Sequence, residues 1–200
     1  RLVPGDALVL EAAAQGVMAG LNAARACRSE ATVVLGRDQA YVGILIDDLV
    51  TKGCLEPYRM FTSRAEHRLR LRIDNADLRL TPLGREVGAV DDERWERFRS
   101  REARLIRNRA YLGETKVRVG GEVMAASRAL ARPDVSIGQL SDLRLEGCGG
   151  DAELDEATLI SELRYEGYLR RQDATQRKVE SSLDRAIPAS FEYRDVPGLS

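Results

Sequence analysis

DDERWERFRSREARLIRNRAYL, residues 91–112, reads as one long amphipathic helix and indicates that the protein is built mainly of helices. The three acidic residues at its start suit the positive N-terminal end of a helix macrodipole. Apolar residues recur on one side and predict a buried face: Trp95, Phe98, Leu105, Ile106 and Leu112. The opposite side carries arginines that suit either a solvated surface or a secondary RNA contact: Arg97, Arg101, Arg104 and Arg107 or Arg109.

Helical patterns also occur on both sides of this stretch. The expected helices cover residues 8–26, 38–50, 64–72, 78–88 and 154–185. Gly53 is expected to end the second of them, and Thr62 or Ser63 to cap the third. Neighbouring helical residues point about 100° apart, so Asp47 and Asp48 do not easily face one metal ion. We expect them to cap a helix or to pair with nearby arginines.

Strand signals occur between the two long helices. Residues 116–119 and 122–124 flank Gly120-Gly121, a pattern that predicts a short hairpin. Loops are expected over residues 132–140 and 147–150, and the glycine cluster at 147–150 marks an internal boundary. The fold class that follows is all-α, with room for one small β-hairpin.

The charge distribution is uneven although the formal net charge is only −1. Residues 59–109 hold fourteen arginines and nine acids, whereas residues 141–162 hold one arginine and seven acids. The two stretches could form a basic and an acidic face that attract each other.

The three cysteines are isolated, which favours a reducing compartment, and we expect a cytoplasmic protein. The lone His67 has no cysteine or histidine beside it, so no metal site is expected.

EPYRMFTSRAEHRLRLRIDNADLRLT, residues 56–81, is the most cationic part of the chain. Guanidinium groups grip phosphates and aromatic rings stack on bases, so the composition suits contact with a nucleic acid. The alternative is a set of arginines that pair with acids elsewhere in the fold. The residues concerned are Arg59, Arg64, Arg68, Arg70 and Arg72, with Tyr58 and Phe61 among them.

The order of residues in this segment resembles the signature of the MnmG/GidA family, the FAD-dependent tRNA uridine 5-carboxymethylaminomethyl modification enzymes. Further segments are similar to that family in the same order. They are EAAAQGVMAGLNAA (11–24), QAYVGILIDDLVTKG (39–53), RYEGYLRRQ (164–172) and IPASFEYRDVPGLS (187–200). His67 departs from the tyrosine that is usual at its position, which puts the role of that tyrosine in doubt here.

The resemblance implies that the chain is a C-terminal fragment. The family begins with a nucleotide-binding domain that carries a GxGxxG loop, which does not occur in this sequence, and it continues into a terminal helical bundle. We therefore expect residues 1–36 to be the last helix of the FAD domain with a linker, and residues 37–200 to be a helical docking domain. Such a fragment would be inactive alone.

The activity that the resemblance implies belongs to the whole enzyme. It adds an aminomethyl or carboxymethylaminomethyl group at position five of the wobble uridine of tRNA. The implied cofactor is FAD, with NADH and methylenetetrahydrofolate as co-substrates, and the implied partners are tRNA, a GTPase and a second copy of the enzyme.

The resemblance also implies roles for residues of this chain. Expected tRNA contacts are Tyr58, Arg59, Arg64, Arg68, Arg70, Arg72, Arg170 and Arg171. Glu11, Gln15 and Gly16 would lie on the side that faces FAD. No catalytic residue is expected here. The alternative is a scaffold for the GTPase partner or for dimerisation that does not touch RNA; the acidic stretch and the helix over residues 154–185 favour it.

Overall fold

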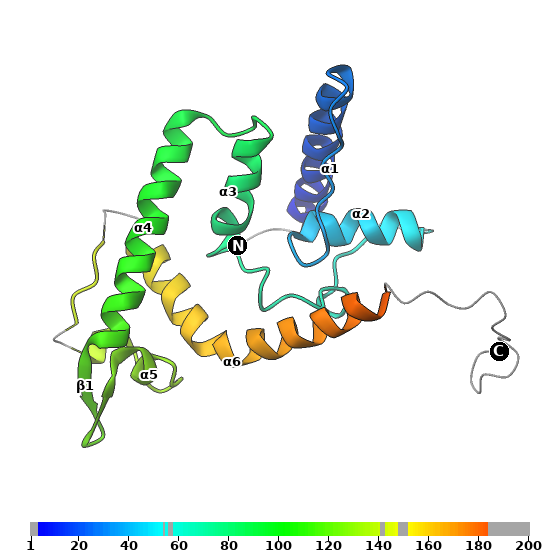
Figure 1. Cartoon of the computed structure of the whole chain (residues 1–200). Helices are drawn as coiled ribbons and strands as arrows, with labels where there is room; N and C mark the ends of the chain where they lie inside the picture. Colours follow the sequence, from blue (N-terminus) through cyan, green and yellow to red (C-terminus); the bar gives the residue numbers. More distant parts are fainter. Residues whose placement is uncertain (1–3, 54, 56–57, 141–142, 148–151, 184–200) are drawn as a thin grey trace, which may run out of the picture. The chain divides into compact units, whose positions relative to one another are not determined.

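Helices dominate the computed structural model, which describes residues 4–53, 55, 58–140, 143–147 and 152–183 (Figure 1). The α-helices are α1 (Pro4–Cys27), α2 (Tyr41–Thr51), α3 (Ala76–Glu86), α4 (Asp92–Glu114), α5 (Ala126–Leu130) and α6 (Ala152–Leu183). Strands β1 (Lys116–Val119) and β2 (Glu122–Ala125) form an antiparallel hairpin. The mainly helical class with one hairpin is confirmed. The short helix α5 and the 3-10 turn Ile137–Gln139 were not predicted.

The chain forms two compact units, Arg1–Tyr165 and Glu166–Ser200. The first contains α1 to α5, the hairpin and the first part of α6, and the second begins inside α6. The domain limits expected from the sequence, 1–36 and 37–200, stay a prediction.

Helix α4 is the main support of the first unit. Asp91 caps it as its acidic start predicts, since its Oδ1 accepts a hydrogen bond from the backbone N–H of Arg94 at 2.8 Å. The helix packs against α3, α5 and β2. Its apolar face enters the larger core, whose buried members are Leu105, Leu112, Ala126, Ala129, Leu130, Val135, Leu140, Leu143 and Leu159. The prediction was wrong for Ile106, which is 64% exposed because it lies outside this face.

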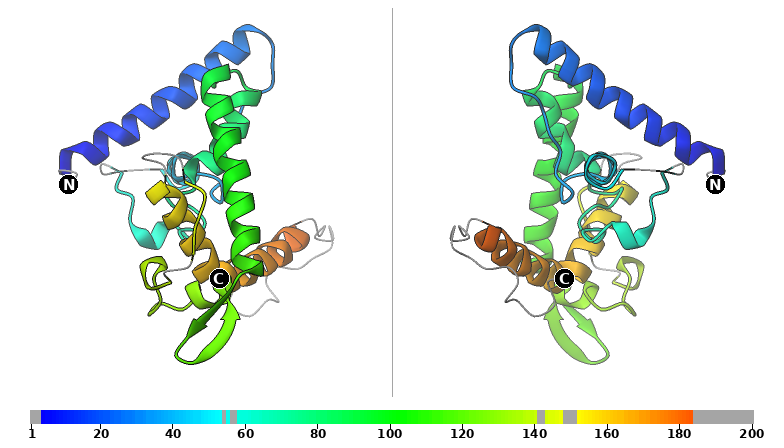
Figure 2. Two further views of the ribbon diagram at one scale, coloured as in Figure 1. Left: turned by 90° about the vertical axis from the view of Figure 1, so that its left-hand side faces the viewer. Right: turned by 90° about the vertical axis from the view of Figure 1, so that its right-hand side faces the viewer.

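The hairpin follows α4 directly and extends from its C-terminal end (Figure 2). Both turn residues, Gly120 and Gly121, have positive φ values of 58° and 89°. This conformation suits glycine and matches the twist of a two-residue hairpin loop. Val117, Val119 and Met124 pack against the larger core, so one face of the hairpin is fixed to the rest of the unit.

Helix α2 lies against the chain that precedes it. A Cβ on Gly43 would stand 2.3 Å from the carbonyl oxygen of Gly36 and 2.6 Å from that of Leu35, so only glycine permits this approach. On its buried side Ile44 forms a small second core with Ala65 and Leu71, against which Met60 packs. This core attaches the cationic segment to α2.

The helix predicted over residues 64–72 is absent. The chain makes a 3-10 turn at Thr62–Arg64 and then a series of turns. Side chains take up backbone carbonyls that a helix would have used: Arg37 donates to the carbonyl of Arg64, Arg72 to that of Leu69, and Asn75 to that of Arg70. Side-chain hydrogen bonds to backbone carbonyls compete with helix formation.

Candidate nucleic-acid interface

The cationic segment is organised around one buried carboxylate, Asp48 of α2, which is 1% exposed. Its oxygens accept hydrogen bonds from Lys52 Nζ at 2.7 Å, Arg37 Nη1 at 2.8 Å, Tyr58 Oη at 2.9 Å and Arg64 Nη1 at 3.2 Å. The sequence expectation that Asp48 pairs with the arginines is confirmed. A buried charge is tolerated where charged partners and hydrogen bonds surround it, as they do here.

These contacts shift the pKa values of the groups involved. Burial of Asp48 raises its pKa, but the hydrogen bonds from Lys52, Tyr58, Arg37 and Arg64 outweigh it and hold the pKa well below its usual value. Burial and the hydrogen bond to Asp48 raise the pKa of Tyr58 to about 12. At neutral pH the site therefore consists of an ionised aspartate and a neutral tyrosine that donates to it.

Arg37 links α2 to the segment. Its Nε and Nη2 form a bidentate pair with Glu66 at 2.6 and 2.9 Å, while its Nη1 reaches Asp47 and Asp48, each at 2.8 Å. The hydrogen bond from Arg37 lowers the pKa of Glu66. The planar fork of arginine suits this set of partners, which a lysine could not satisfy together. Glu66, the one acid among the segment's arginines, is thereby engaged with a residue outside the segment.

Two of the predicted arginines, Arg59 and Arg68, are exposed and have no carboxylate partner among the described residues. The guanidinium of Arg59 lies over the ring of Phe61, 5.2 Å from its centroid, and Phe61 is itself 47% exposed. A cation stacked on an exposed ring offers both a charge to a phosphate and a flat surface to a base.

The other three arginines predicted in the segment have acidic partners within the fold. Arg64 bonds to Asp48, and its guanidinium lies 5.2 Å from the ring centroid of Tyr58. Arg72 pairs with Asp74 at 3.1 Å and is mostly buried, and Arg70 lies 3.8 Å from Asp38. The segment thus combines braced arginines with exposed ones. Pairing with acids elsewhere in the fold is confirmed for Arg64 and Arg70, and contact with a nucleic acid stays a prediction.

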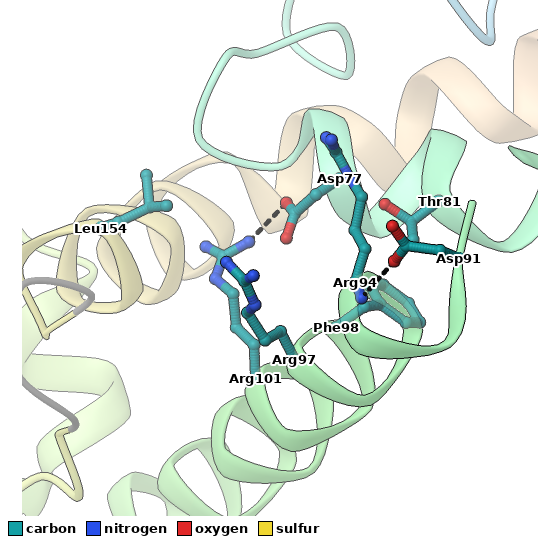
Figure 3. Close-up of a pocket in the computed structure, with 8 residues that line it drawn as sticks. All are labelled: Asp77, Thr81, Asp91, Arg94, Arg97, Phe98, Arg101 and Leu154. Carbon is teal, nitrogen blue, oxygen red and sulfur yellow. Dashed lines mark hydrogen bonds and ion pairs between the residues drawn. The ribbon is translucent and has the colours of Figure 1, made fainter. Parts of the chain in front are cut away.

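The arginines of α4 divide in the same way. Arg101 Nε and Arg104 Nε donate to Asp155 of α6 at 2.9 and 2.5 Å, and both arginines are buried. Arg101 also donates to Asp77 of α3, and both residues line a pocket of about 530 Å³ together with Arg94 and Arg97 (Figure 3). A solvated or RNA-binding role was therefore wrong for Arg101 and Arg104.

The acidic stretch supplies partners to α4. Besides Asp155, Glu146 bonds to Arg107 at 2.7 Å and Glu162 to Arg109 at 2.9 Å. The attraction between a basic and an acidic part of the chain, suggested by the charge distribution, is confirmed at these pairs.

The second unit contains the last two predicted tRNA contacts. Arg170 pairs with Glu166 at 2.7 Å, one turn earlier in α6. The guanidinium of Arg171 lies 4.9 Å from the ring centroid of Tyr168, which is exposed. This stacked pair resembles the pair of Arg59 and Phe61 in its chemistry.

Glu11, Gln15 and Gly16, the residues expected to face FAD, lie on α1. Gln15 and Gly16 are exposed, Glu11 is half-buried, and an added Cβ on Gly16 would meet no atom within 4 Å. One open helix face does not enclose a dinucleotide, and none of the three residues lines a pocket described here. The described residues therefore do not fit FAD without further protein around them.

Comparison with known proteins shows to which family this chain is similar. Residues 92–173 match the family described as the tRNA modifying enzyme MnmG/GidA C-terminal helical domain. The tRNA uridine 5-carboxymethylaminomethyl modification enzyme MnmG of Syntrophotalea carbinolica is 46% identical over 208 residues, covering 95% of this chain and 33% of the relative. The chain belongs to the MnmG/GidA family. It corresponds to the C-terminal region of these enzymes.

Other relatives agree. MnmG of Listeria monocytogenes is 40% identical over 205 residues, covering 95% of this chain and 32% of the relative. The crystal structure of GidA from Aquifex aeolicus superposes with a TM-score of 0.75 at 33% identity, covering 94% of this chain and 31% of the other. The chain thus spans about a third of the length of the MnmG relatives it matches.

Sequence reasoning missed Arg37. It lies in the turn before α2, outside the cationic run, and nothing in its neighbourhood sets it apart from a surface arginine. The available signal was Glu66, a single acid among five arginines that could have paired with any of them.

Within the described residues we find no helix apolar and long enough to cross a membrane, and no cluster of metal-ligating side chains.

Proposed function

We propose that this chain docks tRNA for the MnmG/GidA enzyme of which it forms the C-terminal region, and that residues 58–75 make the main contact. The carrying observation is the contrast within the segment. Asp48 holds the side chains of Tyr58 and Arg64, and Arg37 holds the backbone carbonyl of Arg64. Phe61 is exposed, and Arg59 and Arg68 are exposed without a carboxylate partner among the described residues.

A fixed backbone favours binding because less conformational freedom has to be given up when the ligand arrives. Arg59 and Arg68 would contact phosphates, and Phe61 would stack on a base. Four further residues would act mainly by holding this surface in place, because each already has an acidic partner in the fold: Arg64, Arg70, Arg72 and Tyr58. Arg170 and Arg171 would add a contact from the second unit.

We propose that this docking serves the modification of the wobble uridine at position five. The relatives are named tRNA uridine 5-carboxymethylaminomethyl modification enzymes. We propose FAD, NADH and methylenetetrahydrofolate as the cofactor and co-substrates of the whole enzyme, and a cytoplasmic location. Glu11, Gln15 and Gly16 would then contribute only one wall of the flavin site. No step of the reaction is assigned to residues of this chain.

The alternative is a scaffold for the GTPase partner or for a second copy, without RNA contact. Its main sequence argument was the acidic stretch, yet Glu146, Asp155 and Glu162 pair with arginines of α4 inside the same unit. The exposed apolar side chains Val9, Leu10 and Val17 of α1 still leave room for a protein partner.

The test is equilibrium binding of the chain to a tRNA with a wobble uridine over a series of salt concentrations. Arg59→Ala/Arg68→Ala should weaken binding. It should also make the slope of log affinity against log salt less steep, by about one for each phosphate that the variant no longer binds. The matched control is Arg99→Ala/Arg128→Ala, which removes the same charge from two exposed arginines elsewhere. Equal effects of the two double variants, or no binding by the unmodified chain, would contradict the proposal.

A further inference from the structure

A second cationic surface lies beside the hairpin, outside the segment described above. A groove of about 330 Å³ lies beside β1. It is lined by Thr115, Lys116, Val117, Arg118, Val123, Gln139 and Leu140. Lys116 and Arg118 alternate with the core-facing Val117 and Val119, so both project from the same outer face of the strand.

The charge of this groove is not compensated. No acid lines it, and neither Lys116 nor Arg118 makes an ion pair within the described part of the chain. Glu122 pairs with Val119 across the hairpin, and the strand alternation places it on the opposite face. In the pocket of Figure 3, by contrast, Arg101 bonds to Asp77. Arg97, which also lines that pocket, bonds to Glu93 outside it.

The groove also holds neutral hydrogen-bond donors. The Oε1 of Gln139 accepts from the backbone N–H of Ser136 at 2.8 Å, which leaves the amide –NH2 of Gln139 available to an acceptor. Thr115 contributes a hydroxyl that bonds to no described residue. The support is rigid, because Val117, Val119 and Met124 fix the inner face of the hairpin to the larger core.

We propose that this groove binds phosphates of an RNA backbone, with Lys116 and Arg118 as the charged contacts and Gln139 and Thr115 as neutral donors. Residues two apart on a strand stand about 6.6 Å apart, so the two cations can share one phosphate or hold two neighbouring ones. Charge complementarity selects the ligand, because a groove with two uncompensated cations and no acid attracts a polyanion. The inference rests on the proposed function, since it assigns a second contact to the same tRNA.

The experiment is tRNA binding by the chain carrying Lys116→Ala/Arg118→Ala, measured over a salt series. Binding should weaken to a similar degree for tRNAs of different sequence. The slope of log affinity against log salt should become less steep by about one for each phosphate that the variant no longer binds. Arg99→Ala/Arg128→Ala is again the control of equal charge. Val123→Glu places a carboxylate in the groove while keeping both cations, and it should weaken binding as well. Thermal unfolding by circular dichroism checks that each variant folds.

The outcomes separate this inference from the proposed function. If the unmodified chain binds no tRNA, the proposed function fails. If it binds and Arg59→Ala/Arg68→Ala weakens binding while the hairpin variants leave affinity and salt slope unchanged, only the groove is refuted. Inorganic phosphate is the second probe. If it raises the thermal unfolding temperature more than chloride does at equal ionic strength, only when Lys116 and Arg118 are present, and the hairpin variants leave tRNA affinity unchanged, the ligand is a free oxyanion and the assignment to RNA is overturned.

Discussion

Two regions of the first unit each gather arginines around a nearly inaccessible aspartate, but they expose those arginines to different degrees. Around Asp155 the side chains of Arg101 and Arg104 are each only 6% exposed. Around Asp48 the side chain of Arg37 is 25% exposed and that of Arg64 is 39% exposed. The same ion-pair chemistry is therefore closed to solvent in one region and partly open in the other.

The cores beneath the two regions explain the difference. The network of Asp155 joins α3, α4 and α6 beside the larger core, and Thr158 and the carbonyl of Asp74 complete the hydrogen bonds of Arg101. The small core of Ile44, Ala65 and Leu71, which attaches the cationic segment to α2, has three buried members against nine in the larger core. The first network holds the fold together, and the second holds a surface in place.

Asp155→Asn should have the largest effect. Removing this charge leaves Arg101 and Arg104 buried with too few acidic partners, and breaking a buried pair in this way costs about 3–5 kcal/mol of stability. Urea unfolding followed by circular dichroism measures the loss. Glu146→Gln is the control, because its exposed pair with Arg107 should matter little. A loss no larger than that of the control would show that the two networks do not differ as described.

Asp48→Asn should cost less, about 1.5–3 kcal/mol, as expected for hydrogen bonds to a charged group whose partners partly face solvent. It should also weaken tRNA binding, because Arg37 and Arg64 would no longer hold the segment. Asp155→Asn should reduce tRNA binding only where it unfolds the chain. If Asp48→Asn destabilised the protein and left the affinity for tRNA intact, Asp48 would be a purely structural residue.

Comparing the stability of the unmodified chain with that of Asp48→Asn over a range of pH tests the same carboxylate. Its pKa in the folded state lies below the ordinary value of 3.8, so the unfolded chain takes up the proton first as pH falls. The stability that Asp48 contributes is complete above this value and is lost as the pH falls toward the folded pKa. The difference in stability between the unmodified chain and Asp48→Asn should therefore shrink below about pH 4.

The sequence predicted most of the fold but only part of the site. Residues 91–112, 116–124 and 154–185 carry strong local signals, an acidic helix start, a Gly-Gly turn and apolar periodicity, and the structure has α4, the hairpin and α6 there. Residues 64–72 look helical by the same rules. Their turns depend on Arg37 and Asn75, whose side chains take backbone carbonyls, and a local pattern does not contain that contact.

The roles of the arginines were harder to predict for the same reason. Arg101 and Arg97 stand one helical turn apart on α4 and have the same local context, yet one is buried against Asp155 and the other is exposed. The partner that distinguishes them lies 54 residues away in the sequence. Charge counts detect that basic and acidic stretches coexist, but only the packing of α4 against α6 decides which charges meet.

Tyr58→Phe should have the smallest effect and separates bracing from binding most sharply. It removes the hydroxyl that donates to Asp48 and keeps the ring beneath Arg64, so stability should fall by about 1 kcal/mol while tRNA affinity changes little. The raised pKa of Tyr58, about 12, provides the direct readout. An ultraviolet titration should lose a late-ionising tyrosine in this variant, and in Asp48→Asn the same step should move toward the usual value near 10. Loss of tRNA binding with unchanged stability would instead place this hydroxyl on the RNA, because a group that braces Asp48 cannot be removed without cost to the fold.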